Sequence, residues 1–186
     1  LNPEKSKTNE ISTKYNLTKN IFMNITGYKT KIFDQIESNS AYTKHVNEQI
    51  DIYQKGLESE LTLLNGFQNI TIFSNFSKSR KANGQAQSRR PDLSYGANLN
   101  KKYYLDYFGN FNLNLNYKHT GKYIDWNGNK NSRQKSTDIL DLSFNKKIYD
   151  NIYSLNITNL LNERYEKPAT YNQDGRKIKI NFRRVF

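Results

Sequence analysis

The chain has 186 residues, a formal net charge of +12, no cysteine and only 35% hydrophobic residues. The lack of cysteine excludes disulfides, thiolate metal ligands and cysteine nucleophiles, and the low apolar content makes a large conventional core hard to build. Disorder is disfavoured, because 14 Tyr and 10 Phe give an aromatic content that disordered chains usually lack.

Nine segments with alternating polar and apolar residues predict nine β-strands, since strand side chains point alternately to opposite faces. In the clearest segment, Asn110 to Tyr117, every second residue is asparagine and the others are Phe, Leu, Leu and Tyr. One face suits hydrocarbon and the other water, and no apolar run approaches the roughly 18 residues of a membrane helix. The pattern is typical of a membrane β-barrel. The expected strands are 8–17, 21–33, 47–63, 67–79, 91–101, 109–123, 137–148, 152–165 and 175–186.

The connections between these strands alternate in length. Short ones are expected at 18–20, 64–66, 102–108 and 149–151, and long ones near 34–46, 80–90, 124–136 and 166–174. Outer-membrane barrels have tight turns on the periplasmic side and long loops outside. The last strand follows a long loop, so the C-terminus is expected to be periplasmic. An aromatic belt is expected at the third short turn, with Tyr103, Tyr104, Tyr107 and Phe108.

Alternation also assigns one face of each strand to lipid. Glu58, Glu60 and Thr62 are expected to point inward. Ile50 and Ile52 have the wrong parity, which predicts either a bulge near Gly56 or a section above the membrane. Phe22, Phe73 and Leu160 also break parity. The lipid-facing set is Ile11, Tyr15, Leu17, Met23, Ile25, Leu57, Leu61, Leu63, Tyr95, Ala97, Leu99, Leu140, Leu142, Phe144, Leu155, Ile157, Leu161, Ile178, Ile180 and Phe182.

Bacterial single-chain barrels use even numbers of strands, and an open sheet edge in lipid would leave backbone groups unpaired. The chain is therefore not expected to close into a barrel by itself. It is interpreted as a C-terminal fragment, with further strands before Leu1.

The segment from Leu1 to Tyr15 has the form L-x-P-E-x-S-x-x-x-E-x-S-x-K-Y. Five further segments follow in order: Gly56 to Leu61, Arg90-Pro91, Tyr117 to Tyr123, Asn159 to Tyr165, and Gly175-Arg176 leading to Phe186. Together the six segments resemble TonB-dependent outer-membrane receptors. The chain departs from that family at Ser12, where glycine is usual, and at Asn162, where aspartate is usual.

The resemblance implies a 22-stranded barrel plugged by an N-terminal domain, of which residues 1–186 would be the last nine strands. Such a receptor imports a scarce ligand, a ferric siderophore or cobalamin, and is energised by the TonB complex through its N-terminal region. The implied partners are outer-membrane lipid, lipopolysaccharide and the barrel-assembly machinery. No cofactor and no nucleic acid is implied. The final strand would serve assembly through Gly175, Ile178, Ile180, Phe182 and Phe186; it could equally be an amphipathic strand ending at the aromatic belt.

Catalysis is disfavoured. The only histidines, His45 and His119, have no nearby carboxylate or serine arranged as a triad, and His119 is expected in the lumen or at an interface. Glu58 and Glu60 share one face and could in principle do acid chemistry. We expect them instead to pair with Arg or Lys of the plug or of neighbouring strands.

Ligand contacts are expected from the long loops. Arginines 80, 89 and 90 could hold an anionic ligand, and Tyr123, Trp126 and Tyr171 could stack on a flat one. Alternatively, Arg80, Arg89 and Arg90 face lipopolysaccharide phosphates and the three aromatics belong to the outer belt. Two other functions stay open: a plug-less porin or adhesin-type barrel, and a soluble basic β-protein that binds glycan or nucleic acid. Scattered cations argue against the nucleic acid.

Overall fold

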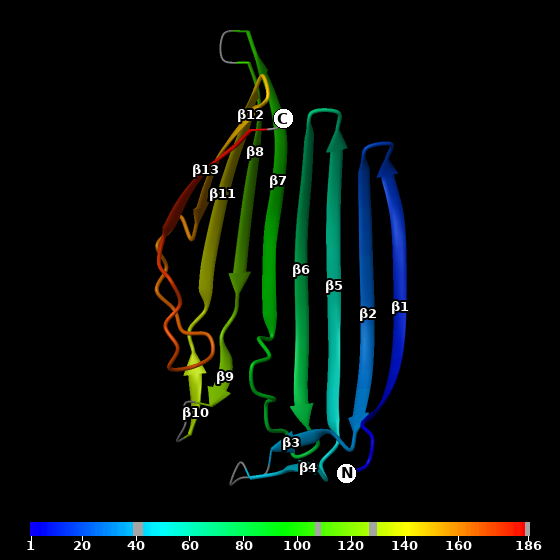
Figure 1. Cartoon of the computed structure of the whole chain (residues 1–186). Coiled ribbons are helices and arrows are strands. Elements are labelled where there is room, and N and C mark those ends of the chain that lie inside the picture. The colour runs from blue at the N-terminus through cyan, green and yellow to red at the C-terminus, as the bar shows by residue number, and fades with distance from the viewer. Residues whose placement is uncertain (39–42, 107–108, 127–129, 185–186) are drawn as a thin grey trace.

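The computed structural model describes residues 1–38, 43–106, 109–126 and 130–184. It contains one nine-stranded antiparallel sheet and two small hairpins. Figure 1 shows the sheet as a single curved layer with β1 and β13 at its edges. None of the described residues forms a helix that could cross a membrane. The sheet strands, in spatial order, are β1 (Lys5–Thr18), β2 (Ile21–Phe33), β5 (Ile52–Asn65), β6 (Gln68–Lys81), β7 (Leu93–Leu105), β8 (Gly109–Thr120), β11 (Thr137–Ile148), β12 (Asn151–Thr158) and β13 (Lys177–Arg184).

The nine predicted strands are confirmed, and each pairs with its neighbours in chain order. Tight turns join the strands at one end of the sheet, as at Lys19-Asn20 and Tyr149-Asp150. The other end, the long-loop end, carries two hairpins that the alternation did not predict. In the lower part of Figure 1, β3 (Ile36–Ser38) pairs with β4 (His45–Asn47), and β9 (Tyr123–Trp126) pairs with β10 (Asn131–Gln134).

Most strand boundaries shift by a few residues, and Tyr123, predicted to end the sixth strand, belongs to β9 instead. Two boundaries differ from the prediction by more. The third strand starts at Ile52 rather than at 47, because His45–Asn47 pairs within the β3/β4 hairpin. The eighth ends at Thr158 rather than at 165. Asn159 turns the chain there with a φ of 51°, and its side chain bonds both the N–H and the C=O of Glu163. Leu161, predicted to face lipid, therefore lies outside any strand.

Apart from Leu161 and from Leu17, which has no partner in the register of β1, the strand registers place the predicted lipid-facing residues on one face of the sheet. Met23 lies opposite Leu61, which lies opposite Ile72, and Leu115 is flanked by Leu99 and Leu142. We call this side the apolar face. The polar face carries Glu58, Glu60 and ladders of asparagine, such as Asn116 donating to Asn98 at 2.5 Å. The strongly exposed Ile11, Ile178 and Ile180 belong to the edge strands.

Of the two explanations offered for the parity of Ile50 and Ile52, the bulge near Gly56 is wrong, and the section above the membrane stays a prediction. From Ile52 to Leu63, β5 keeps an unbroken register with both β2 and β6, and the irregularity lies between Asn16 and Thr18 instead. Ile52 has the parity of the polar face and is fully buried at the long-loop end. Phe73, another break in parity, lies opposite Gly96 on the polar face, where the missing Cβ makes room for its ring.

Aromatic side chains gather near the short-turn end. Tyr103 stacks on Phe111 with ring centroids 4.8 Å apart, and Phe67 meets Tyr104 edge-on at 5.3 Å. Tyr103 and Phe111 lie on the apolar face, where a belt at the lipid interface is expected, whereas Tyr104 lies opposite Asn110 on the polar face. Tyr107, Phe108 and Phe186 lie outside the described residues.

Candidate functional site

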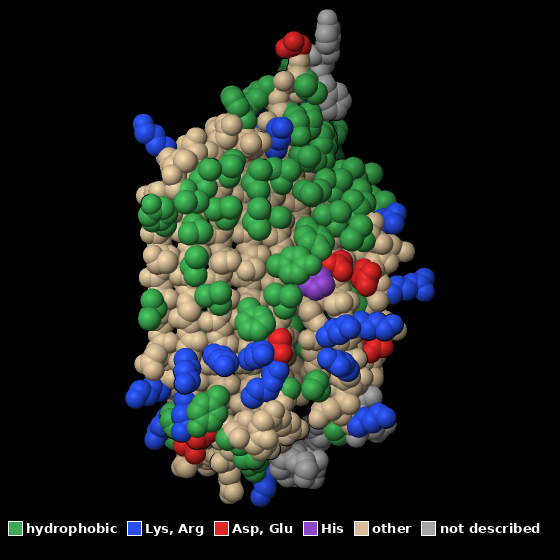
Figure 2. Space-filling model, turned by 180° about the vertical axis from the view of Figure 1, so that it is seen from behind, with side chains coloured by type: hydrophobic (Ala, Val, Ile, Leu, Met, Phe, Trp, Pro, Cys, Tyr) green, Lys and Arg blue, Asp and Glu red, His purple; other side chains and the backbone are tan. Residues whose placement is uncertain are grey.

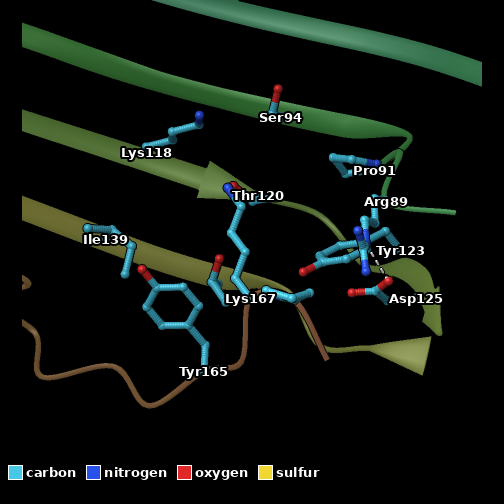
Figure 3. A pocket seen from close by; sticks show the side chains of 12 residues that line it. Arg89, Pro91, Ser94, Lys118, Thr120, Tyr123, Asp125, Ile139, Tyr165 and Lys167 are labelled. Atoms are coloured by element: carbon cyan, nitrogen blue, oxygen red, sulfur yellow. Dashed lines mark hydrogen bonds and ion pairs between the residues drawn. The ribbon is translucent and has the colours of Figure 1, made fainter. Parts of the chain in front are cut away.

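A pocket of about 390 Å³ opens on the polar face at the long-loop end (Figure 3). Its floor comes from the ends of β7, β8 and β11, and its walls from the three long connections that follow β6, β8 and β12. The lining residues are Arg89, Pro91, Ser94, Lys118, Thr120, Tyr123, Asp125, Thr137, Ile139, Tyr165, Lys167 and Pro168. Segments far apart in the sequence thus build one concave site, which is the usual form of a small-molecule site.

Asp125 ties the three connections together. Its buried carboxylate accepts hydrogen bonds from Arg89 Nε at 2.7 Å, from the Ala169 N–H at 2.8 Å and from the Trp126 N–H at 2.8 Å. Burial acts to raise the pKa of Asp125, but these three donors outweigh it and hold the pKa below its ordinary value. The carboxylate is therefore ionised at neutral pH and offsets the charge of Arg89.

Two lysines give the pocket an uncompensated positive charge. Lys118 projects from the polar face of β8, and Lys167 comes from the connection before β13. In Figure 3 the Lys167 side chain reaches toward the end of β8 at Thr120. Within the described part of the chain, neither lysine has an acidic partner, and Asp125 is the only carboxylate lining the pocket. Both ammonium groups are available to an anion.

The phenol of Tyr123 completes the polar part of the site. Burial, with a smaller contribution from the Asp125 charge, raises the pKa of Tyr123, so its hydroxyl stays protonated and can donate a hydrogen bond. Pro91, Ile139 and Pro168 supply apolar wall. The arrangement suits an anionic ligand with a flat or apolar body, since charge-assisted hydrogen bonds fix its oxygens.

The structure brings some of the predicted ligand contacts together and separates others. Arg89 and Tyr123 line this pocket, whereas Arg90 and Trp126 line a more open cavity next to it. Arg80 lies on the apolar face, where it forms a bidentate pair with Asp92. Tyr171 is 65% exposed and lines neither pocket. The sequence prediction missed Lys118, Asp125, Tyr165 and Lys167 as site residues.

The other candidates take separate places. His119 lies on the apolar face and stacks on Tyr95. Its Nδ1 is 2.8 Å from Oδ1 of Asp138, which lies opposite it on β11, so it has a carboxylate partner that is distant in the sequence. Glu58 lies on the polar face and accepts a hydrogen bond from Asn75 at 3.1 Å, rather than from the expected Arg or Lys. In the described ranges no three His, Cys, Asp or Glu side chains are grouped to hold a metal ion.

The proposed assembly residues partly fall in β13. Ile178, Ile180 and Phe182 share its apolar face and are exposed at the sheet edge. Gly175 lies against the Asn162 side chain, whose oxygen accepts from the Arg176 N–H at 2.9 Å.

Comparison with known proteins places the fold. A family model described as TonB dependent receptor-like, beta-barrel, matches residues 1–160. No curated protein sequence matches the chain.

Several solved structures resemble the chain at low sequence identity. The ferric yersiniabactin uptake receptor FyuA from Yersinia pestis has a TM-score of 0.77 at 20% identity, over 96% of this chain and 28% of that one. The ferripyoverdine receptor of Pseudomonas aeruginosa has a TM-score of 0.80 at 16% identity, over 98% and 27%. The ferric-catecholate import receptor Fiu from E. coli has a TM-score of 0.77 at 14% identity, over 97% of this chain and 27% of that one. The chain therefore spans less than a third of the length of these structures.

Proposed function

Because the chain belongs to the TonB-dependent receptor-like β-barrel family, we propose that residues 1–186 are the C-terminal barrel segment of an outer-membrane receptor that imports ferric siderophores. Its mechanism would be binding and gated import rather than catalysis. The tight turns and the C-terminus would face the periplasm, and the long-loop end would face outward.

The observation that carries this proposal is the pocket at the long-loop end, with its free Lys118 and Lys167 beside the Arg89–Asp125 pair. A receptor must capture its ligand at the outer end of the lumen. The polar face of the sheet is the side that a barrel of this family turns to its lumen. Cations and phenols there suit a metal chelate with negative oxygen donors.

The similar structures favour iron as the cargo. FyuA is named for ferric yersiniabactin, the Pseudomonas receptor for ferripyoverdine and Fiu for ferric catecholates. Cobalamin is therefore the second ligand class for this chain. The proposal also includes the TonB complex, acting through an N-terminal region, and the barrel-assembly machinery and lipopolysaccharide as partners.

Uptake by the complete receptor tests the proposal. A strain lacking it, grown under iron limitation, should lose uptake of at least one radiolabelled ferric siderophore from a panel, and uptake should require TonB. Replacing Lys118 or Lys167 with Gln should weaken binding roughly tenfold for each charge-assisted hydrogen bond lost. The matched controls Lys14→Gln and Lys147→Gln, also on the polar face but outside the pocket, should bind normally. Unchanged uptake of every iron chelate, with lost uptake of cobalamin, would contradict the ligand class.

A further inference from the structure

Three lysines form a row across adjacent strands on the apolar face. Lys29 of β2 lies directly opposite Lys55 of β5, which lies directly opposite Lys78 of β6. The row that lies two residues closer to the centre of the sheet is Gly27, Leu57 and Phe76. Figure 2 shows this face with Lys and Arg side chains in a band toward the long-loop end, below the apolar side chains. The lysine row thus marks the border of the apolar surface.

This arrangement is unfavourable without an external anion, because like charges directly opposite each other destabilise a sheet. All three lysines are exposed, and none has an acidic partner within the described ranges. In the next row, two of the three cations are neutralised by the chain itself: Lys31 pairs with Asp51 at 2.8 Å and Arg80 with Asp92 at 2.7 Å, whereas Lys7, opposite Lys31 on the edge strand, has no acidic partner among the described residues. Lys78 Nζ lies 5.6 Å from the centroid of the Phe76 ring, a cation–π contact that leaves its charge uncompensated. The positive charge of the lysine row is therefore not balanced by any acidic side chain in the described ranges.

The spacing of the row indicates the kind of partner. Neighbouring strands are about 4.8 Å apart, so the three lysines span about 10 Å along the sheet. That width exceeds one phosphate and suits a headgroup with two or more. Leu57 and Phe76, both exposed beside the row, offer a surface for acyl chains. A multiply phosphorylated lipid meets both requirements, whereas a lipid with a single phosphate can engage only part of the row.

We propose that Lys29, Lys55 and Lys78 bind the phosphates of a lipopolysaccharide molecule in the outer leaflet, with its acyl chains against Leu57 and Phe76. The inference rests on the proposed outer-membrane function. It places the lipopolysaccharide contact on the strands, whereas the sequence had suggested the loop arginines Arg89 and Arg90 together with Arg80.

The test uses the complete receptor in detergent. The triple variant Lys29→Gln, Lys55→Gln, Lys78→Gln is compared with Lys14→Gln, Lys147→Gln, Lys179→Gln, which removes the same charge from the polar face. Native mass spectrometry counts retained lipopolysaccharide, and titration of delipidated receptor measures its affinity. The first variant should bind lipopolysaccharide about 100-fold more weakly, because each lysine near an anionic surface contributes roughly fivefold. The polar-face variant should bind like wild type.

Stability without lipid separates binding from a structural role. In detergent free of lipopolysaccharide, the triple variant should be at least as heat-stable as wild type, because repulsion within the row is gone. The inference is overturned if the triple variant is less stable than wild type in that detergent, or if both variants lose lipopolysaccharide equally. It is also overturned if the wild-type receptor binds phosphatidylglycerol, which has a single phosphate, as tightly as lipopolysaccharide. If the wild-type receptor takes up its chelate and the triple variant retains as much lipopolysaccharide as wild type, the inference is overturned while the proposed function stands. A wild-type protein absent from the outer membrane would overturn both.

Discussion

Tyr28 and Gly56 face each other directly in the register of β2 and β5, and the tyrosine ring occupies the space that a side chain at position 56 would need. A Cβ at Gly56 would lie 2.6 Å from Tyr28 Cζ and 2.8 Å from the backbone oxygen of Phe76. The Tyr28 hydroxyl lies 3.3 Å from Ser77 Oγ, so the ring bridges from β2 across β5 to β6. The glycine lets three strands share one aromatic side chain.

We therefore expect Gly56→Ala to destabilise the folded complete receptor by about 1–3 kcal/mol, since the backbone contact cannot be relieved by a rotamer change. Gly27→Ala is the matched control. Gly27 belongs to the same strand pair but faces the apolar side, where a Cβ would meet nothing within 4 Å. Urea unfolding midpoints measure both variants, and an equal effect of the two substitutions would show that the Tyr28 contact is unimportant.

Asp125 should make the packing of the three long connections that line the pocket sensitive to acid. Its pKa in the folded protein lies below the ordinary 3.8, so its stabilising contribution is complete above pH 3.8 and is lost as the pH falls through the lower folded value. Amide hydrogen exchange at Ala169 and Trp126, corrected for intrinsic rates, should show loop opening rising only below pH 3.8.

Asp125→Asn should raise loop opening at pH 7 roughly tenfold, because hydrogen bonds to a charged group contribute about 1.5 kcal/mol or more. In this variant, loop opening should no longer rise when the pH falls below 3.8. Asp150→Asn, in the turn at the opposite end, serves as control and should change neither. A rise at low pH that persists in Asp125→Asn would assign the titration to another group.

Phe186→Ser in the complete receptor should lower the amount of assembled receptor in the outer membrane while leaving the ligand affinity of the assembled molecules unchanged. The last strand would be read during assembly by pairing at an open edge. Quantitative blotting of the heat-modifiable form, together with binding to whole cells normalised to that amount, measures the two effects. Normal receptor levels with weakened binding would instead assign the terminal strand to the ligand site.

The strands could be predicted because polar and apolar residues alternate over eight or more positions. Such a pattern puts all apolar side chains on one face of a strand, as in Asn110 to Tyr117. The β3/β4 and β9/β10 hairpins are too short to show such a period. The bulge prediction failed for a related reason: Ile52 is buried at the long-loop end, so an apolar residue on the polar face there needs no change of register.

The site was less predictable than the fold. Parity places Lys118 on the polar face, because it follows Tyr117 in the same alternating strand, so this residue could have been found. The contact between Arg89 and Asp125, which are 36 residues apart, depends on how two loops fold over the sheet. No periodicity specifies such a contact, and the same holds for Tyr165 and Lys167.

The assignment of the two faces is the central claim, and adjacent residues of β8 test it most directly. Leu113 lies on the apolar face between Lys101 and Phe144, whereas Asn114 lies on the polar face and accepts a hydrogen bond from Asn100. In the complete receptor folded in lipid, we compare the denaturant midpoints of Leu113→Arg and Asn114→Arg. Leu113 lies one row inside the Tyr103–Phe111 contact, so the first should lose about 1–3 kcal/mol, between the cost of a lipid-facing arginine at the interface and that at the midplane, while the second stays hydrated and close to wild type. Equal midpoints, or a greater loss for Asn114→Arg, would contradict the account.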